Sequence, residues 1–242
     1  MPGSTEIAVL LDRSGSMARA REDHEGGLNS FIRDQRELEG DVRFTFVQFD
    51  DQDPCEVIHN GTPLKDVAPV TLKPRGYTPL LDAVGKSIGV LDKRLQQAAA
   101  KPDQVIFMII TDGLENASQE WKKDMVKKLV EEKQAAGWAF LFLGANIDAF
   151  HEAGSIGIAQ VTTMSYTDRD AGAMYAAVSS NVGGARQLSM RGAPAAAVRD
   201  SLNWTDAQRS AAVGQDPQTT AAPPAPEDPP VTLKGDWKVT RR

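Results

Sequence analysis

The fold is decided by the stretch Ile7-Ala8-Val9-Leu10-Leu11-Asp12-Arg13-Ser14-Gly15-Ser16. Its five leading apolar residues lack the alternation of a half-buried strand, which predicts a short strand that is buried on both faces. Such strands are typical of parallel sheets that carry helices on either side. In sheets of that kind, ligands bind beyond the carboxyl ends of the strands. We therefore expect Asp12, Ser14 and Ser16 at the binding edge of the sheet.

Apolar runs and helical patterns alternate along the chain as far as residue 187. The later strands are expected at residues 42–49, 55–59, 105–110, 138–143 and 160–165, and the helices at 79–97, 119–136, 148–153 and 171–187. The run 105–110 is the most apolar and should lie centrally. The link 50–54 is too short for a parallel crossover, so strand 55–59 should run antiparallel to strand 42–49. The pattern predicts an α/β fold with a mostly parallel, doubly wound, Rossmann-like sheet.

Two local features of the helices are also predicted. The charged segment 17–27 is expected to delay the first helix to about residues 28–38. In the helix 119–136, Trp121, Met125 and Leu129 are expected to face inward, together with Val126 and Val130 if the inward stripe is wide.

The sequence changes character after about residue 190. We expect a first domain at residues 1–189, a short helical extension at 190–213 and an extended, Pro/Ala-rich low-complexity tail at 214–242. Short helices are expected at 194–203 and 206–213, the second with Thr205 as its N-cap. Trp237, with the basic residues Lys234, Lys238, Arg241 and Arg242 around it, is either a docking peptide or a solvated terminus.

Composition narrows the class of protein. With 27 basic and 33 acidic residues the net charge is −6, which argues against a general binder of nucleic acid or of anionic membranes. The single cysteine, Cys55, cannot form a disulfide within the chain, and a reducing compartment fits best. The first apolar run is too short for a signal peptide, and no apolar stretch approaches the roughly 18 residues of a membrane helix. We expect a cytoplasmic protein.

Three loops are expected to supply oxygen ligands for a metal ion. The first carries Asp12, Ser14 and Ser16, the second carries Thr78 within Arg75-Gly76-Tyr77-Thr78-Pro79, and the third carries Asp112 within Thr111-Asp112-Gly113. Oxygen donors suit Mg²⁺, and the absence of His and Cys from the set argues against zinc and copper. Two carboxylates only balance a divalent ion, which can then accept an acidic oxygen from another molecule.

This order of residues resembles the metal-ion-dependent adhesion site (MIDAS) of von Willebrand factor A (VWA) domains. The resemblance covers roughly residues 4–187 and includes Gly-Tyr-Thr-Pro-Leu around Thr78 and Thr-Asp-Gly after an apolar strand. It implies a three-layer fold whose six-stranded sheet has one antiparallel edge strand. It also implies Mg²⁺ or Mn²⁺ as the cofactor, and a protein partner whose Asp or Glu completes the coordination. The ligands, some through water, would be Asp12, Ser14, Ser16, Thr78 and Asp112.

The leading functional hypothesis is a metal-dependent protein-binding module, an adaptor or assembly component rather than an enzyme, of bacterial or phage type. One alternative is a Mg²⁺-dependent phosphohydrolase with Asp12 as the nucleophile, although Ser14 stands where haloacid-dehalogenase-like phosphatases have a second Asp. Another is a structural subunit with a stabilising or vestigial metal site. Nucleotide binding is disfavoured, because neither GxGxxG nor a Walker A loop follows the first strand. The oligomeric state is not predicted.

Several of these residues also have ordinary structural interpretations. A capping turn is the lesser alternative for Asp12, Ser14 and Ser16, and a helix N-cap is the alternative for Thr78. Residues near the predicted site have similar alternatives. Glu115 and Asn116 either form a turn or contact a partner, and Asp82 provides a favourable charge at a helix N-terminus. Asn146 and Asp148 either cap a helix or lie on the rim of the site. The three histidines, His24, His59 and His151, lack metal-ligand spacing and are expected in surface or structural roles.

Overall fold

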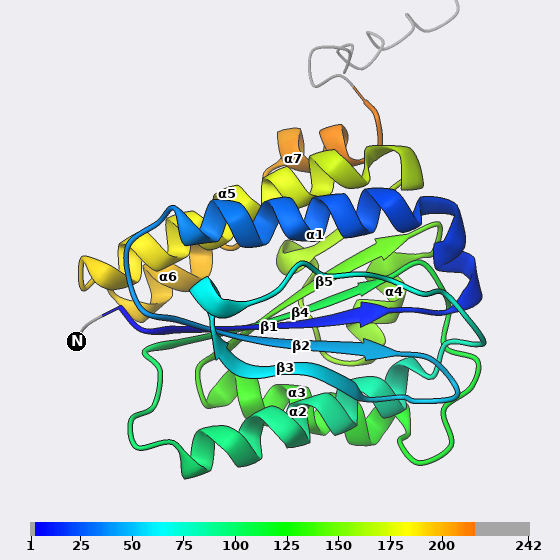
Figure 1. Cartoon of the computed structure of the whole chain (residues 1–242), viewed down its shortest axis with the longest axis horizontal. Helices are drawn as coiled ribbons and strands as arrows, with labels where there is room; N and C mark the ends of the chain where they lie inside the picture. The colour runs from blue at the N-terminus through cyan, green and yellow to red at the C-terminus, as the bar shows by residue number, and fades with distance from the viewer. Residues whose placement is uncertain (1–2, 216–242) are drawn as a thin grey trace, which may run out of the picture.

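The computed structural model describes residues 3–215, and these build one six-stranded sheet between two layers of helices (Figure 1). The strands are β1 (Thr5–Asp12), β2 (Val42–Phe49), β3 (Glu56–Pro63), β4 (Gln104–Thr111), β5 (Trp138–Ala145) and β6 (Thr163–Tyr166). Their order is β3-β2-β1-β4-β5-β6, and every pair is parallel except β2 and β3. The fold class and the antiparallel edge strand are therefore confirmed.

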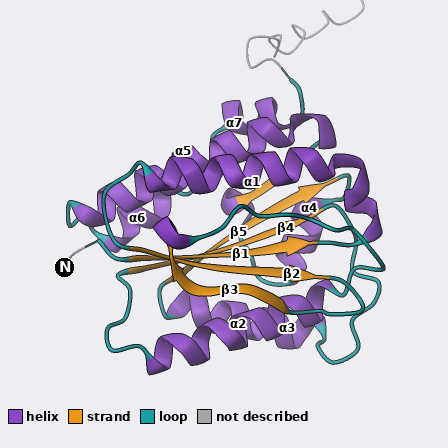
Figure 2. Ribbon diagram, in the orientation of Figure 1, coloured by secondary structure: helices purple, strands orange, loops and turns teal. Residues whose placement is uncertain are grey.

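Helices cover both faces of the sheet (Figure 2). On one face lie α1 (Arg21–Arg36) and α5 (Ala171–Met190), followed by α6 (Ala195–Asp200) and α7 (Asp206–Ala212). On the other lie α2 (Leu80–Gln97), α3 (Lys123–Ala135) and α4 (Ala149–Ser155). Short 3₁₀ helices occupy Gly15–Ala20, Leu64–Asp66, Gln160–Thr162 and Asp168–Asp170.

The strand β1 explains the two-sided core. Ile7, Val9 and Leu11 pack into the cluster under α1 and α5, whereas Ala8 and Leu10 pack into the cluster under α2 and α3. All eight residues of β1 are buried, as a strand covered on both faces requires. The direction of strand order reverses at β1, because β2 lies on one side of it and β4 on the other. The loops that follow β1 and β4 therefore meet at a topological switch point.

The predicted delay of the first helix is wrong. A 3₁₀ helix occupies Gly15–Ala20, and α1 begins directly after it at Arg21. Charge does not oppose this start, since Glu22 and Asp23 lie in the first turn, where the helix dipole favours acidic residues. The row of α1 residues that faces the core begins with His24, which is fully buried. Because histidine is polar, the spacing of apolar residues does not reveal where this helix starts.

Two further expectations need correction at the level of single residues. Val126 and Val130 are the fully buried apolar residues of α3, and Leu129 and Trp121 are packed against the same core, as predicted, whereas Met125 is 45% exposed. Trp121 lies before the helix and packs against Gly85 of α2, so close that a Cβ on this glycine would meet the indole ring at 2.2 Å. The last strand is β6, at Thr163–Tyr166, because residues 160–162 form a 3₁₀ turn.

The helices after residue 190 pack on the α1 and α5 layer. Val198, Leu202 and Trp204 are buried in the same apolar cluster as α1 and α5. Thr205 caps α7 in a capping box with Gln208, as predicted. Arg209 of α7 donates to the carbonyl oxygens of residues 160, 161 and 163, beside the outer strand β6. Among residues 3–215, no helix is long and apolar enough to cross a membrane. The expectation for Trp237 and most of the predicted tail lie outside the described residues.

Candidate metal centre

Three loops meet beyond the carboxyl ends of β1 and β4 and are tied together through their backbones. The first loop (residues 12–16) and the second (75–78) share two hydrogen bonds, from Arg75 N to Arg13 O at 2.8 Å and from Gly15 N to Gly76 O at 3.1 Å. The third loop (111–118) joins the second through Asn116, whose N–H donates to Thr78 O at 3.1 Å. The side chain of Asn116 accepts from Thr78 N at 2.9 Å. The loops thus form one connected surface.

Four of the five predicted ligands form a continuous hydrogen-bonded row. Asp12 Oδ1 accepts from Ser14 N at 2.6 Å, and the Oγ atoms of Ser14 and Ser16 lie 3.0 Å apart. Ser16 Oγ then donates to Asp112 Oδ1 at 2.6 Å. Asp12 therefore does make a tight turn, as the capping interpretation allows. The two serine hydroxyls, however, face each other and Asp112 rather than a helix N-terminus.

The fifth predicted ligand, Thr78, lies beside this row. Its side chain is buried, and a Cβ built on Gly113 would come within 2.6 Å of Thr78 Oγ1. A glycine at position 113 therefore gives Thr78 its place next to Asp112. Thr78 is not an N-cap, because α2 begins at Leu80 and its N-cap residue is Pro79. The structure thus brings all five predicted side chains to one place.

Burial raises the pKa of both carboxyl groups in this cluster. Asp12 is fully buried, and loss of water raises its pKa to about 6, despite hydrogen bonds from Thr111 and Ser14. Burial also raises the pKa of Asp112, and the negative charge of Asp168 adds to this despite the hydrogen bond from Ser16. The nearest cation in sequence, Arg13, turns away and pairs with Asp50. Arg19 acts on Asp112 through its charge, but among the described residues neither carboxyl forms an ion pair, and two desolvated carboxyls of this kind favour the entry of a positive ion.

The donor set fits a hard divalent cation. Its members are two carboxylates and three hydroxyls, all oxygen, and such a set leaves room for water in the shell of Mg²⁺. Within the described residues, no cluster of three or more His, Cys, Asp or Glu side chains is arranged for a metal. Only two of the five predicted ligands are of those types, so a site made of them depends on Ser14, Ser16 and Thr78.

Glu115 and Asp82 stabilise the loops rather than face a partner. Glu115 accepts from Leu81 N at 2.9 Å, at the start of α2, and from two amides of its own loop. Asp82, in the first turn of α2, accepts in return from the amides of residues 119, 120 and 121 at 2.7–3.0 Å. The turn interpretation of Glu115 is confirmed. Asp82 does more than favour the helix dipole, because it anchors the segment that leads into α3.

The rim of the cluster includes a residue that the sequence analysis missed. Asp148 caps α4 by accepting from His151 N at 3.0 Å, as predicted. Asn146 has a positive φ of 56° and donates to Asp168 Oδ1 at 2.9 Å. Asp168 follows β6, and its charge acts on the pKa of Asp112. Its place after a strand was the available signal, since the predicted strand 160–165 ends one residue before β6 does.

His24 has a structural place under the loops. It is fully buried, with Nδ1 3.2 Å from the hydroxyl of Tyr175 and Nε2 3.5 Å from that of Tyr166. Burial lowers its pKa to about 4, so His24 is neutral at physiological pH. This position agrees with the structural role predicted for it.

Comparison with known proteins shows a likeness in fold. No family model matches the chain, and no curated protein matches it in sequence. A solved structure of proximal thread matrix protein 1 (PTMP1) from the mussel byssus has a TM-score of 0.56 at 14% identity, over 73% of this chain and 45% of that one. Another PTMP1 structure, with a zinc-occupied MIDAS motif, has a TM-score of 0.51 at 16% identity, over 69% and 42%.

A von Willebrand factor type A structure from Catenulispora acidiphila has a TM-score of 0.49 at 13% identity, over 73% of this chain and 42% of that one. The chain thus spans less than half the length of these solved chains. At such identities the likeness concerns the fold alone. Taken with the strand order, it shows that this chain shares a Rossmann-like α/β fold with PTMP1.

Proposed function

We propose that this chain is a metal-dependent protein-binding module that captures an acidic side chain of a partner. The observation that carries the proposal is the hydrogen-bonded row from Asp12 through Ser14 and Ser16 to Asp112, with Thr78 beside it. A divalent cation bound there supplies a positive charge and a coordination position for a carboxylate. The chain's own residues hold the ligand loops at the switch point of the sheet and bury the carboxyl groups of Asp12 and Asp112.

The choice of Mg²⁺ or Mn²⁺ rests on the chemistry of the donors. Asp12, Ser14, Ser16, Thr78 and Asp112 offer only oxygen, which hard cations prefer. A PTMP1 structure of similar fold has a zinc-occupied MIDAS motif, which supports a divalent ion here without deciding which ion this chain selects.

The surface around the cluster is suited to a protein partner. Tyr77, from the second loop, is 65% exposed, and Leu114, from the third loop, is 53% exposed. Large apolar side chains of this kind, next to a charged centre, are common at protein interfaces. A role as an adaptor or assembly component in the cytoplasm is part of this proposal. The location rests on the single cysteine, and the acidic composition favours a protein partner over nucleic acid or an anionic membrane.

Two alternatives make different demands on the same residues. A hydrolase with Asp12 as nucleophile would use the same carboxylate, whose Oδ1 accepts from Ser14 N and whose Oδ2 accepts from Thr111 Oγ1 at 2.6 Å. Each oxygen keeps a lone pair for a metal ion or a substrate, so turnover of a phosphoester is the observation that separates the two functions. A purely structural metal site would leave partner capture independent of the ion.

The test is a pull-down from the source lysate with Mg²⁺ or with EDTA, using the wild type, Asp12→Ala and the surface control Asp124→Ala. The proposal expects a partner that wild type and Asp124→Ala retain in Mg²⁺, and that both chelation and Asp12→Ala release. A partner that is indifferent to chelation and to Asp12→Ala would contradict it. Turnover of a phosphoester that Asp12→Asn abolishes would favour the hydrolase.

A further inference from the structure

Asp50 lies outside the predicted ligand set, in the loop that follows β2, and its side chain is fully buried. One of its oxygens, Oδ2, accepts from Arg13 Nε at 2.7 Å and from Arg75 Nε at 2.8 Å. Arg13 stands between the predicted ligands Asp12 and Ser14, and Arg75 stands three residues before Thr78. A single carboxylate oxygen thus joins the first and second loops.

The carboxylate of Asp50 is itself held in place. Its other oxygen, Oδ1, accepts from Gln52 N at 2.8 Å and from Asp53 N at 3.0 Å. Although burial raises the pKa of Asp50, the hydrogen bonds from Arg75 and from these amides outweigh burial and hold the pKa below its usual value. The group is therefore a fixed anion at the end of β2.

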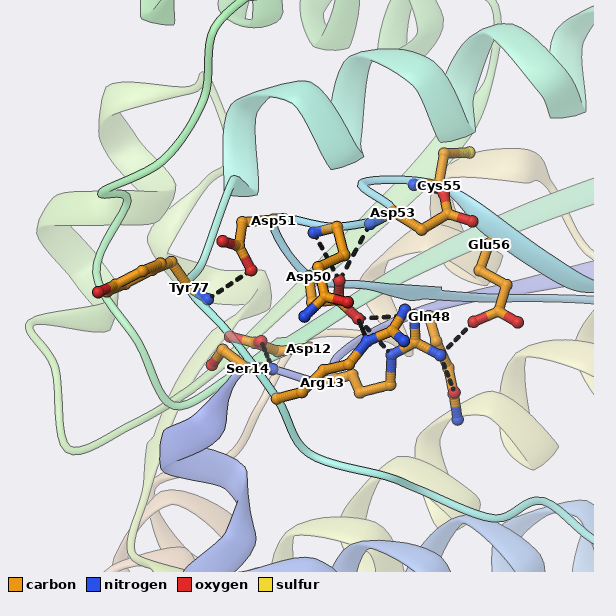
Figure 3. Close-up of polar contacts among 12 residues, drawn as sticks. Asp12, Arg13, Ser14, Gln48, Asp50, Asp51, Asp53, Cys55, Glu56 and Tyr77 are labelled. Atoms are coloured by element: carbon orange, nitrogen blue, oxygen red, sulfur yellow. Dashed lines mark hydrogen bonds and ion pairs between the residues drawn. The ribbon is translucent and has the colours of Figure 1, made fainter.

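Arg13 is fixed on its other side as well (Figure 3). Its Nη1 donates to Gln48 Oε1 at 3.3 Å and pairs with Glu56, and its own side chain is buried. Gln48 in turn donates to Thr71 O at 2.6 Å. The guanidinium therefore binds to β2 and β3 and points away from Asp12.

The residue after Asp50 supports the second loop directly. Asp51 Oδ1 accepts from Tyr77 N at 2.9 Å (Figure 3). Gly76 has a positive φ of 67°, and a Cβ on it would lie 1.8 Å from Asp51 Oδ1. Only glycine allows this approach. The β2–β3 loop thus contacts the second loop at three successive residues, Arg75, Gly76 and Tyr77.

We propose that Asp50 is a positioning residue that sets the separation of the first and second loops by holding Arg13 and Arg75 on one oxygen. The effect on metal binding rests on the proposed function, because Ser14, Ser16 and Thr78 are the groups whose spacing it fixes. The effect on the loops themselves does not, and it can be measured without metal.

Arg75→Gln is the decisive variant, since the side chain of Arg75 is 44% exposed and its loss need not unfold the protein. If charge alone matters, removing the positive charge of Arg75 strengthens Mn²⁺ binding. If Arg75 positions the loops, its loss instead weakens Mn²⁺ binding by about tenfold, as is typical of residues that orient metal ligands. Titration calorimetry with Mn²⁺ shows whether the affinity rises or falls. Arg19→Gln is the matched control, an exposed arginine of the same face whose charge also reaches Asp112.

Asp50→Asn and Asp53→Asn form the second pair, because both lie in the same loop and only Asp50 touches the arginines. In metal-free protein, we expect amide exchange at Gly15 and Arg75 to accelerate at least tenfold in Asp50→Asn and Arg75→Gln, and not in Asp53→Asn. We expect Arg75→Lys to recover part of the Mn²⁺ affinity.

Unchanged exchange at both amides, or tighter Mn²⁺ binding in Arg75→Gln, would overturn the proposed role of Asp50. A wild type that binds no Mn²⁺ overturns the proposed function instead, and amide exchange then still decides whether Asp50 holds the loops. A fall in melting temperature with unchanged exchange and unchanged affinity would identify Asp50 as a purely stabilising residue and reject positioning.

Discussion

Ser16 Oγ donates to Asp112 Oδ1 at 2.6 Å, which joins two loops whose residues are 96 positions apart in the chain. The contact exists because β1 and β4 are parallel neighbours, so that the residues after them emerge at the same edge of the sheet. The exposed hydroxyl and the buried carboxylate would both face a bound cation. In metal-free protein, each satisfies the other.

Ser16→Ala should weaken Mn²⁺ binding by about tenfold or more, because it removes one of the five oxygen ligands. Stability should change by less than about 1 kcal/mol, since Ser16 is exposed. Calorimetric titration gives the first quantity and thermal unfolding in EDTA gives the second. Ser30→Ala on α1 is the control, and equal Mn²⁺ affinities of the two variants would remove Ser16 from the site.

The pH dependence of metal binding should follow Asp12. Its pKa of about 6 in the folded protein lies above the ordinary 3.8, so the folded state holds a proton that a cation must displace. We expect Mn²⁺ affinity to rise about tenfold from pH 5 to pH 7 and to level off above.

The stability of the metal-free protein should show the opposite trend. The folded state binds this proton more tightly than the unfolded chain does. Asp12 therefore makes the free energy of unfolding fall as the pH rises from about 4 to about 6. Saturating Mn²⁺ should cancel that fall. Affinity that does not vary between pH 5 and pH 7 would mean that Asp12 is not a ligand.

Asp82→Ala should destabilise the fold by about 3 kcal/mol, because the amides of residues 119, 120 and 121 lose a shared buried acceptor. For a chain of this size, that corresponds to a melting temperature lower by about 6–12 °C. The matched control is Asp124→Ala, an exposed acid in the first turn of α3. Similar melting temperatures of the two variants would refute the anchoring role of Asp82.

Most of the fold could be predicted from the sequence, because β1, β4 and β5 are nearly continuous apolar runs that alternate with helical patterns. The link after β2 could only form a tight connection, which predicted the antiparallel β3. The start of α1 could not be predicted from apolar spacing, because its inward stripe begins with the buried His24. Among the residues expected to face inward from residues 119–136, only Met125 is exposed, because α3 packs Val126 and Val130 against the sheet instead.

Part of the candidate site could be predicted from the sequence and part could not. Asp12 ends β1 and Asp112 follows β4, so both could be predicted from their positions at the carboxyl ends of strands. Asp50 could not be, because its role depends on arginines 37 and 25 positions away. Asp168 was missed although the carboxyl end of β6, at Tyr166, lies one residue after the predicted end at 165.

The relation of the last two helices to the domain can also be tested. Trp204 is buried in the cluster that contains α1 and α5. If residues 190–213 share the stability of the domain, Trp204→Ala should lower the free energy of unfolding by about 3–5 kcal/mol in a single transition. Denaturant unfolding, with the exposed Val161→Ala as the control, measures this. A main transition that Trp204→Ala leaves unchanged would make 190–213 a separate extension.

Anomalous diffraction from crystals grown with Mn²⁺ locates the ion itself, without reference to function. We expect one strong peak within bonding or water-bridged distance of the side-chain oxygens of Asp12, Ser14, Ser16, Thr78 and Asp112, and no peak there in Asp12→Ala crystals. A peak elsewhere, or none at saturating Mn²⁺, would contradict the proposed metal site.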